Sequence, residues 1–158
     1  IYLPSNGIIQ GIRPLIGYNY GAGERKRVEQ IYRLTLELTA GIMAAGMALC
    51  WLIPGGLIGL FTENPETITI GIAALHIISL GFILSAVSVT SSGALEALGQ
   101  GMASLVISVM RYVAVIIPAA FVLSRLIGVT GVWWAFVCTE GVTAAVAYVL
   151  YHRVWKRA

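Results

Sequence analysis

Apolar residues fill four long blocks of this sequence, and short polar or glycine-rich stretches separate the blocks. An α-helix needs about 20 apolar residues to cross the hydrocarbon core of a bilayer. Each block is close to that length or longer. The pattern therefore predicts an all-α integral membrane protein with four full spans, expected over residues 34–61, 68–94, 102–123 and 129–151.

Residues 1–20 are predicted to be the end of a further span. An interrupted helix of this kind is tolerated in a membrane only where protein or a wet cavity surrounds it. The chain begins at Ile1 without an initiator methionine or a signal-peptide pattern, so we expect that sequence precedes it. The residues that interrupt the apolar run are Pro4, Asn6, Gln10, Arg13 and Pro14.

Composition strengthens the membrane prediction. Hydrophobic residues make up 58% of the chain and charged residues 11%, which is more apolar side chain than a soluble domain of 158 residues can bury. The net charge of +3 does not point to nucleic acid, because the cations flank the apolar blocks. By the positive-inside rule, the loop over residues 21–33 and the C-terminus are predicted to be cytoplasmic. Cys50 and Cys138 lie in different blocks, and no metal site is expected.

Two ionisable residues lie deep inside the apolar blocks. At about 1.5 Å per residue, Glu140 is about 16 Å from either end of its block. Arg111 lies about a third of the way along the neighbouring block, where its long side chain can reach toward Glu140. Burying a charge in a membrane is costly, so each needs a partner or a wet cavity. The pair is either a structural contact between antiparallel helices or part of an ion pathway.

A stripe of small and polar residues follows one face of the second block. Its residues recur at the spacing of a 3.6-residue helix. The stripe is either a packing seam with hydroxyl bonds between helices or one wall of a substrate cavity, and His76 is expected on the opposite face. Its members are Gly81, Ser85, Ser88, Ser92 and Glu96.

Local features place three helix boundaries and one bend. Asn64 is a good helix cap before Pro65, so a helix is expected to start there. Glycines 128 and 131 predict a tight turn between the last two blocks. Pro118 removes a backbone hydrogen bond and should bend the third block.

Three segments resemble the MATE family of multidrug and toxic-compound extrusion transporters. The first, GIRPLIGYNYGAGERKRV, is similar to the end of the family's eighth helix and the loop that follows it. SGALEALGQGMASLVISVMRY is similar to the turn between its tenth and eleventh helices, and IGVTGVWWAFVCTE to the entry of its twelfth. Most of the likeness of the first segment is carried by Pro14, Gly17, Tyr18, Asn19, Gly21 and Ala22.

This resemblance implies that the chain is the C-terminal part of a twelve-helix transporter, with four full spans and the end of a fifth. The family exports cationic amphiphilic drugs and toxic organic cations in exchange for protons or sodium ions, with no cofactor. The implied location is the bacterial cytoplasmic (inner) membrane, and the implied partner is the missing N-terminal lobe of the same chain. Arg13 and Glu96 stand where the family often has glutamine, and a charge at either position is expected to alter substrate preference.

Three alternatives remain open at this point. A lipid-linked oligosaccharide flippase of the same superfamily would need several basic residues in its cavity, and Arg111 is the one cation placed for that role. An intramembrane hydrolase would need Ser91 or Ser92 beside His76, and the helical spacing argues against this, so we expect no enzyme. A truncated fragment would have no activity of its own. The candidate pathway residues are Glu140, Arg111, Glu96, Ser92, Ser88 and Ser85.

Overall fold

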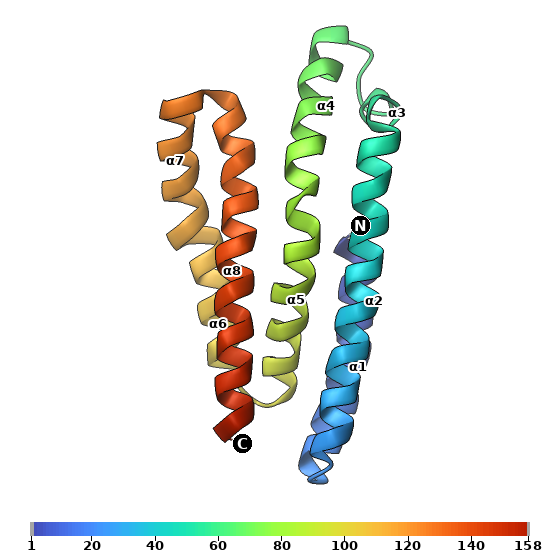
Figure 1. The fold of residues 1–158 in the computed structure, drawn as a ribbon, viewed down its shortest axis with the longest axis vertical. Coiled ribbons are helices and arrows are strands. Elements are labelled where there is room, and N and C mark those ends of the chain that lie inside the picture. The colour runs from blue at the N-terminus through green and yellow to red at the C-terminus, as the bar shows by residue number, and fades with distance from the viewer. Residues whose placement is uncertain (1, 158) are drawn as a thin grey trace.

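The computed structural model describes the backbone of residues 2–157, and every regular element within that range is a helix. The helices run roughly side by side along one axis (Figure 1). In chain order they are α1 Tyr2–Gly21, α2 Arg25–Leu52, α3 Pro54–Gly59, α4 Pro65–Ser79, α5 Gly81–Ala97, α6 Gly101–Val109, the π-helix η1 Met110–Val115, α7 Ile116–Ile127 and α8 Val129–Arg157.

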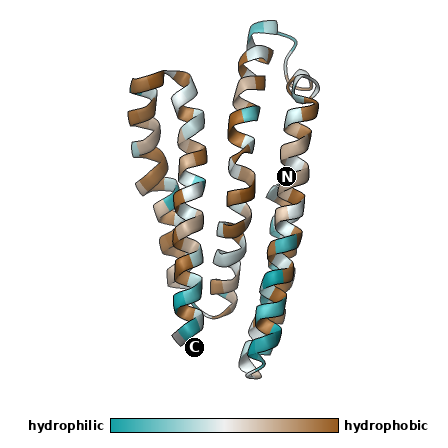
Figure 2. Ribbon diagram, in the orientation of Figure 1, coloured by the Kyte–Doolittle hydropathy of each residue, from teal (hydrophilic) through white to brown (hydrophobic). Residues whose placement is uncertain are grey.

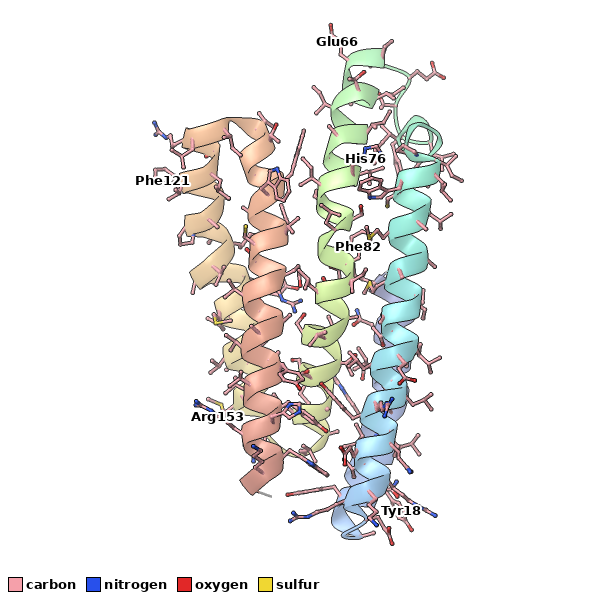
Figure 3. All side chains as sticks on the ribbon, viewed as in Figure 1. Tyr18, Glu66, His76, Phe82, Phe121 and Arg153 are labelled. Atoms are coloured by element: carbon pink, nitrogen blue, oxygen red, sulfur yellow. The ribbon has the colours of Figure 1, made fainter. Side chains whose placement is uncertain are left out.

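The lengths and hydropathy of these helices confirm the membrane fold. Three continuous helical stretches are long and apolar enough to cross a bilayer, namely α2, α6 through α7, and α8. The bent pair α4 and α5 makes a fourth if it is counted as one span. Of the residues in the apolar 18-residue window of the α6–α7 stretch, 6% are buried. Phe121 on α7 points away from the bundle (Figure 3). This surface is suited to lipid, since the hydrocarbon core solvates apolar side chains.

Two of the expected continuous spans are interrupted. The block 34–61 is divided, because α2 ends at Leu52 and the short helix α3 begins at Pro54. Proline has no N–H to continue the α2 ladder but is well suited to the first position of a new helix. The helix α2 also begins at Arg25, so it extends beyond the apolar block into the basic segment.

The block 68–94 is bent by 47° between α4 and α5, at Leu80. Ser79 contributes to this break, because its hydroxyl donates to the carbonyl of His76 at 3.1 Å and accepts from Trp51 Nε1 at 3.1 Å. Side chains that bond to their own backbone in this way often bend helices. Gly81 follows the break, and a Cβ there would lie 3.4 Å from the Cγ of Glu140. The glycine therefore lets α8 approach α5 closely.

The expected disturbance at Pro118 takes the form of a π-helix. Residues Met110–Val115 adopt π-helical hydrogen bonding immediately before α7, which contains Pro118. The carbonyl four residues before Pro118 belongs to Ala114 and cannot receive a bond from the proline nitrogen. Single-turn π-helices of this kind relieve such a mismatch and are frequent at functional sites. Arg111 lies within this turn.

The expected cap of α4 is present. Asn64 Oδ1 accepts from the backbone N–H groups of Glu66 at 2.9 Å and Thr67 at 3.4 Å. Replacing Asn64 with alanine leaves both donors without this acceptor and should lower the free energy of unfolding by about 1 kcal/mol. Thermal unfolding in a mild detergent measures the change. Asn64→Asp, which keeps the cap, is the control, and equal melting of the two variants would contradict the assignment.

The two segments that are predicted to be cytoplasmic lie at one end of the bundle. The α1–α2 turn and the C-terminus lie at the same end, where hydrophilic residues gather (Figures 1 and 2). Tyr18 and Arg153 are at this end and Glu66 is at the other (Figure 3). Helix α5 lies between α2 and α8 in the bundle, so its small-residue face is positioned to meet several helices.

Candidate functional site

The polar stripe of α5 is the centre of the candidate site. Its residues contact α1, α6, η1 and α8. Gly81 lies against Glu140 of α8, and Ser85 Oγ is 2.7 Å from the hydroxyl of Tyr2 on α1. Since Ser85 donates its own hydrogen to the Gly81 carbonyl at 3.0 Å, the Tyr2 hydroxyl is the donor between them.

The predicted contact between Arg111 and Glu140 is formed in the structure. Arg111 Nη2 lies 3.7 Å from Glu140 Oε2, and the exposed fractions of the two side chains are 12% and 15%. Ser88 lies between them: its hydroxyl accepts from Arg111 and is 3.5 Å from Glu140 Oε2. This cluster joins η1, α5 and α8. The distance of 3.7 Å between Arg111 Nη2 and Glu140 Oε2 is longer than the distance of about 2.7–2.9 Å that is usual in a tight ion pair.

A second ion pair lies toward the other end of α5. Arg13 Nη2 of α1 is 2.5 Å from Glu96 Oε2, and the two side chains are 34% and 35% exposed. Ser104 of α6 donates to Glu96 Oε1 at 2.6 Å, and Ser92 is 2.5 Å from Ser104. Because Ser104 has a single hydrogen and gives it to the carboxylate, Ser92 donates to Ser104.

The sequence marks Arg13 and Glu96 as separate candidates, but nothing in it pairs them, and it gives no sign of the contacts made by Ser104 and Tyr2. Arg13 and Glu96 are 83 positions apart in the chain, with no shared periodicity to connect them. The small-residue face of α5 is a signal in the sequence that other helices pack closely against it. Nothing in the sequence shows which side chain on that helix makes the contact.

Two neighbouring pockets open along this stripe. The polar pocket, of about 200 Å³, is bordered by α1, α5, α6 and η1. The apolar pocket, of about 300 Å³, is bordered mainly by η1, α7, α8 and the α4–α5 bend. They share Tyr2, Arg111 and Tyr112. The polar pocket is lined by Asn6, Gln10, Arg13, Ser92, Glu96 and Ser108 among others, and the apolar pocket by Ile78, Phe82, Ile116, Phe136, Thr139 and Glu140.

The other residues named from the sequence lie outside this stripe. The ring of His76 packs on Trp51 of α2, with centroids 5.0 Å apart (Figure 3). Ser91 bonds to the hydroxyl of Tyr32 at 2.9 Å. Neither serine of the hydrolase alternative therefore contacts His76, and the described residues do not form a serine–histidine pair there. A further carboxylate of α2, Glu37, also lies outside the stripe and forms an exposed pair with Arg33 at 3.0 Å.

The first segment that resembles the MATE family forms the end of α1 and its turn into α2. Asn19 is buried and donates to the Leu15 carbonyl at 2.8 Å, while its own carbonyl accepts from the Glu24 N–H at 2.9 Å. Gly17 faces the Ala97 carbonyl, where a Cβ would lie at 3.4 Å. These contacts close a helix end and pack it on α5, so the described contacts of the motif are structural.

No group of three or more histidine, cysteine or carboxylate side chains within the described part of the chain could hold a metal ion. The charged groups of the site are two arginines and two glutamates, which form two ion pairs.

Bent, lipid-facing helices around two ion pairs define this chain as part of a polytopic membrane protein. The MatE family model matches residues 1–122, and the chain belongs to that family. Multidrug export protein MepA of Staphylococcus saprophyticus is 27% identical over 151 residues, which are 96% of this chain and 33% of that protein. MepA of Staphylococcus aureus is 26% identical with the same coverage. The chain thus spans about a third of the length of these relatives.

Solved structures show the same fold. The structure of the MATE multidrug transporter DinF-BH has a TM-score of 0.86 and 31% identity, covering 95% of this chain and 34% of that one. The inward-facing conformation of a multidrug resistance MATE family transporter of the MOP superfamily has a TM-score of 0.93, 21% identity, and coverage of 98% and 36%. The all-helical transporter fold expected from the sequence is therefore confirmed.

Proposed function

We propose that the natural protein containing this chain is a secondary active multidrug exporter. It exports cationic amphiphilic compounds in exchange for protons or sodium ions, by alternating access, across a bacterial cytoplasmic membrane. The family and the names of its relatives support the class of activity. The observation that supports ion coupling most is the Glu140–Arg111–Ser88 cluster, which places a largely covered carboxylate beside a pocket within membrane-spanning helices.

The cluster offers a physical route from proton or cation binding to helix movement. Neutralising Glu140 removes its attraction for Arg111, so the relative stability of arrangements that keep or break this contact changes. The contact joins α8 to η1 and α5, and two irregular points lie close to it: the π-helix itself and the break at Leu80. Interrupted helices around a central site are typical of transporters that rock between two states.

The net charge of the residues that line the two pockets argues against a flippase for a diphosphate-linked lipid. Arg13 and Arg111 both line the polar pocket, but each lies beside a glutamate, and the four charges sum to zero. A diphosphate carries at least two negative charges and would need cations that are not already paired. Drug export is therefore favoured over the flippase alternative.

The orientation of the chain is part of the same proposal. The end of the bundle that holds the α1–α2 turn and the C-terminus carries Arg25, Lys26, Arg27, Arg33, Arg153 and Lys156. Arg125 lies in the last turn of α7, at the opposite end of the bundle. By the positive-inside rule the first end is cytoplasmic. Single cysteines introduced at Glu66 and at Arg153 and labelled from either side of the membrane test this assignment. The cysteine at position 153 should react from the cytoplasmic side and the one at position 66 from the other side.

Exchanging Glu140 for glutamine tests ion coupling. The amide has nearly the same shape as the carboxylate but carries no charge, so it can neither take up a proton nor attract a cation. We expect drug export from vesicles under a proton or sodium gradient to fall about tenfold, within the range usual for a lost coupling between two sites. The natural full-length protein should be used. The control is Glu37→Gln, which neutralises an exposed carboxylate of the same type. Normal export by a folded Glu140→Gln protein would reduce Glu140 to a packing role.

A further inference from the structure

A third pocket lies between α2 and α8, at the end of the bundle that holds the α1–α2 turn and the C-terminus. Its volume is about 230 Å³, and it shares no lining residue with the polar and apolar pockets along α5. Aromatic rings and charged side chains line it together. They are Glu29, Tyr32, Arg33 and Leu36 of α2 and Tyr148, Tyr151, His152 and Trp155 of α8.

This α2–α8 pocket lies at the depth of the lipid head groups. The apolar block of α2 begins at residue 34 and that of α8 ends at residue 151, so the lining residues on each helix extend across the boundary of its block. Tyrosine and tryptophan are enriched at this depth, because their rings are apolar and their polar atoms can reach water. A head group can therefore enter the pocket while its acyl chains stay in the bilayer.

Stacked rings fix one side of the pocket. The rings of Tyr32 and Tyr151 are nearly parallel, with centroids 4.0 Å apart, and both side chains are buried. The hydroxyl of Tyr32 is also held by Ser91 at 2.9 Å. Tyr148 is 48% exposed by contrast, so its ring is accessible to a ligand. The face of such a ring attracts a cation.

The polar side chains of the pocket keep acceptors and donors that the described residues do not use. Glu29 forms no ion pair with any of these residues. His152 Nδ1 lies 3.0 Å from the Tyr148 carbonyl, which can only accept, so Nδ1 donates and Nε2 of the neutral ring remains an acceptor. Arg33 donates from Nε to Glu37 at 3.0 Å, and its two Nη groups bond to no other described residue.

We propose that the α2–α8 pocket binds the phosphoethanolamine head group of a phospholipid from the cytoplasmic leaflet. The ammonium lies beside Glu29, His152 Nε2 and the Tyr148 ring, and the phosphate lies beside Arg33. One carboxylate and one guanidinium match the single positive and single negative charge of this head group, and both contacts are charge-assisted hydrogen bonds. The lipid is not a transported substrate, because the pocket is separate from the two along α5. It is a contact that joins α2 to α8.

Two lipids with the same acyl chains test the proposal. Phosphatidylethanolamine has both charges, whereas phosphatidylglycerol has the phosphate but no cation. Binding of each lipid to the full-length natural protein in detergent is measured by native mass spectrometry. Glu29→Gln should weaken binding of phosphatidylethanolamine about tenfold, as expected for a lost charge-assisted hydrogen bond. It should leave phosphatidylglycerol unchanged or more tightly bound, because a negative charge is removed from the pocket.

A second variant and a matched control complete the test. Arg33→Gln should weaken both lipids, because both carry the phosphate. Glu24→Gln removes an exposed carboxylate from the same end of the bundle but outside the pocket, and should change neither lipid.

Three outcomes would overturn the proposal. Equal weakening of both lipids by Glu29→Gln would mean that Glu29 has only a structural role. Unchanged binding of phosphatidylethanolamine to that variant would mean that another part of the protein covers the pocket. Tighter binding of phosphatidylglycerol to Glu29→Gln, with no loss of phosphatidylethanolamine, would indicate a site for anionic lipids. None of these measurements uses an ion gradient, so the result does not depend on the proposed export.

Discussion

Replacing Gly131 with alanine is expected to prevent stable folding. Gly131 lies in the first turn of α8, against the end of α7. A Cβ there would overlap the carbonyl group of Leu123 and lie 2.9 Å from the backbone nitrogen of Ser124. These are backbone atoms, which cannot rotate aside as a side chain can, so the two helices must separate. Overpacking of this severity should cost about 3 kcal/mol or more, a large part of a typical folding free energy.

The measurement is the folded fraction after detergent extraction, followed by the unfolding temperature. Gly141→Ala is a matched control on the same helix, because a Cβ at Gly141 would meet only Leu84 Cδ1 at 3.8 Å. That variant should be as stable as the wild type or more so, since alanine favours a helix over glycine. Equal stability of the two variants would show that the α7–α8 contact is looser than described.

Replacing Arg111 with methionine is expected to have a comparable effect for an electrostatic reason. Glu140 would then remain in the bundle, at 15% exposure, without its cation. Removing one partner of a buried ion pair costs about 3–5 kcal/mol, while removing both charges is often close to neutral. Arg111→Met should therefore be strongly destabilising, and Arg111→Met with Glu140→Gln should recover most of the loss.

Thermal unfolding of the natural protein in detergent compares these variants. Arg33→Met is the control, because the exposed pair Arg33–Glu37 should contribute less than about 1 kcal/mol. If Arg111→Met lowers the free energy of unfolding by less than about 1 kcal/mol, like the exposed-pair control, the Arg111–Glu140 pair is not an important contact between α8 and η1. If the double variant is stable but no longer exports drug under a gradient, the charges serve transport and not only packing.

Several features of the site could be predicted from the sequence because they depend on position along one helix. The depth of Glu140 follows from its distance to the ends of an apolar block, and a charge at that depth requires a partner. The small-residue face of α5 follows from the spacing of its serines. The cap at Asn64 follows from local backbone geometry. Each of these predictions depends only on positions within a single helix.

Other features could not be predicted because they depend on how helices cross. The break at Leu80 is formed partly by a bond from Trp51 on another helix, and an apolar run gives no sign of it. The pairing of Arg13 with Glu96 depends on α1 and α5 lying in contact at one height. Ser104 joins this pair only because α6 turns back along α5 after Gly99, which has a positive φ of 77°.

The sequence by itself determined that this protein lies in a membrane, where α4 begins, and which charges are too deep to remain alone, since hydropathy and backbone propensity act locally. Only the tertiary structure decided which charges meet. It placed Arg111 with Glu140 and Arg13 with Glu96, along two pockets that share Arg111. The physical reason is that an ion pair needs atoms within about 4 Å, and positions this distant along the chain come that close only through helix packing.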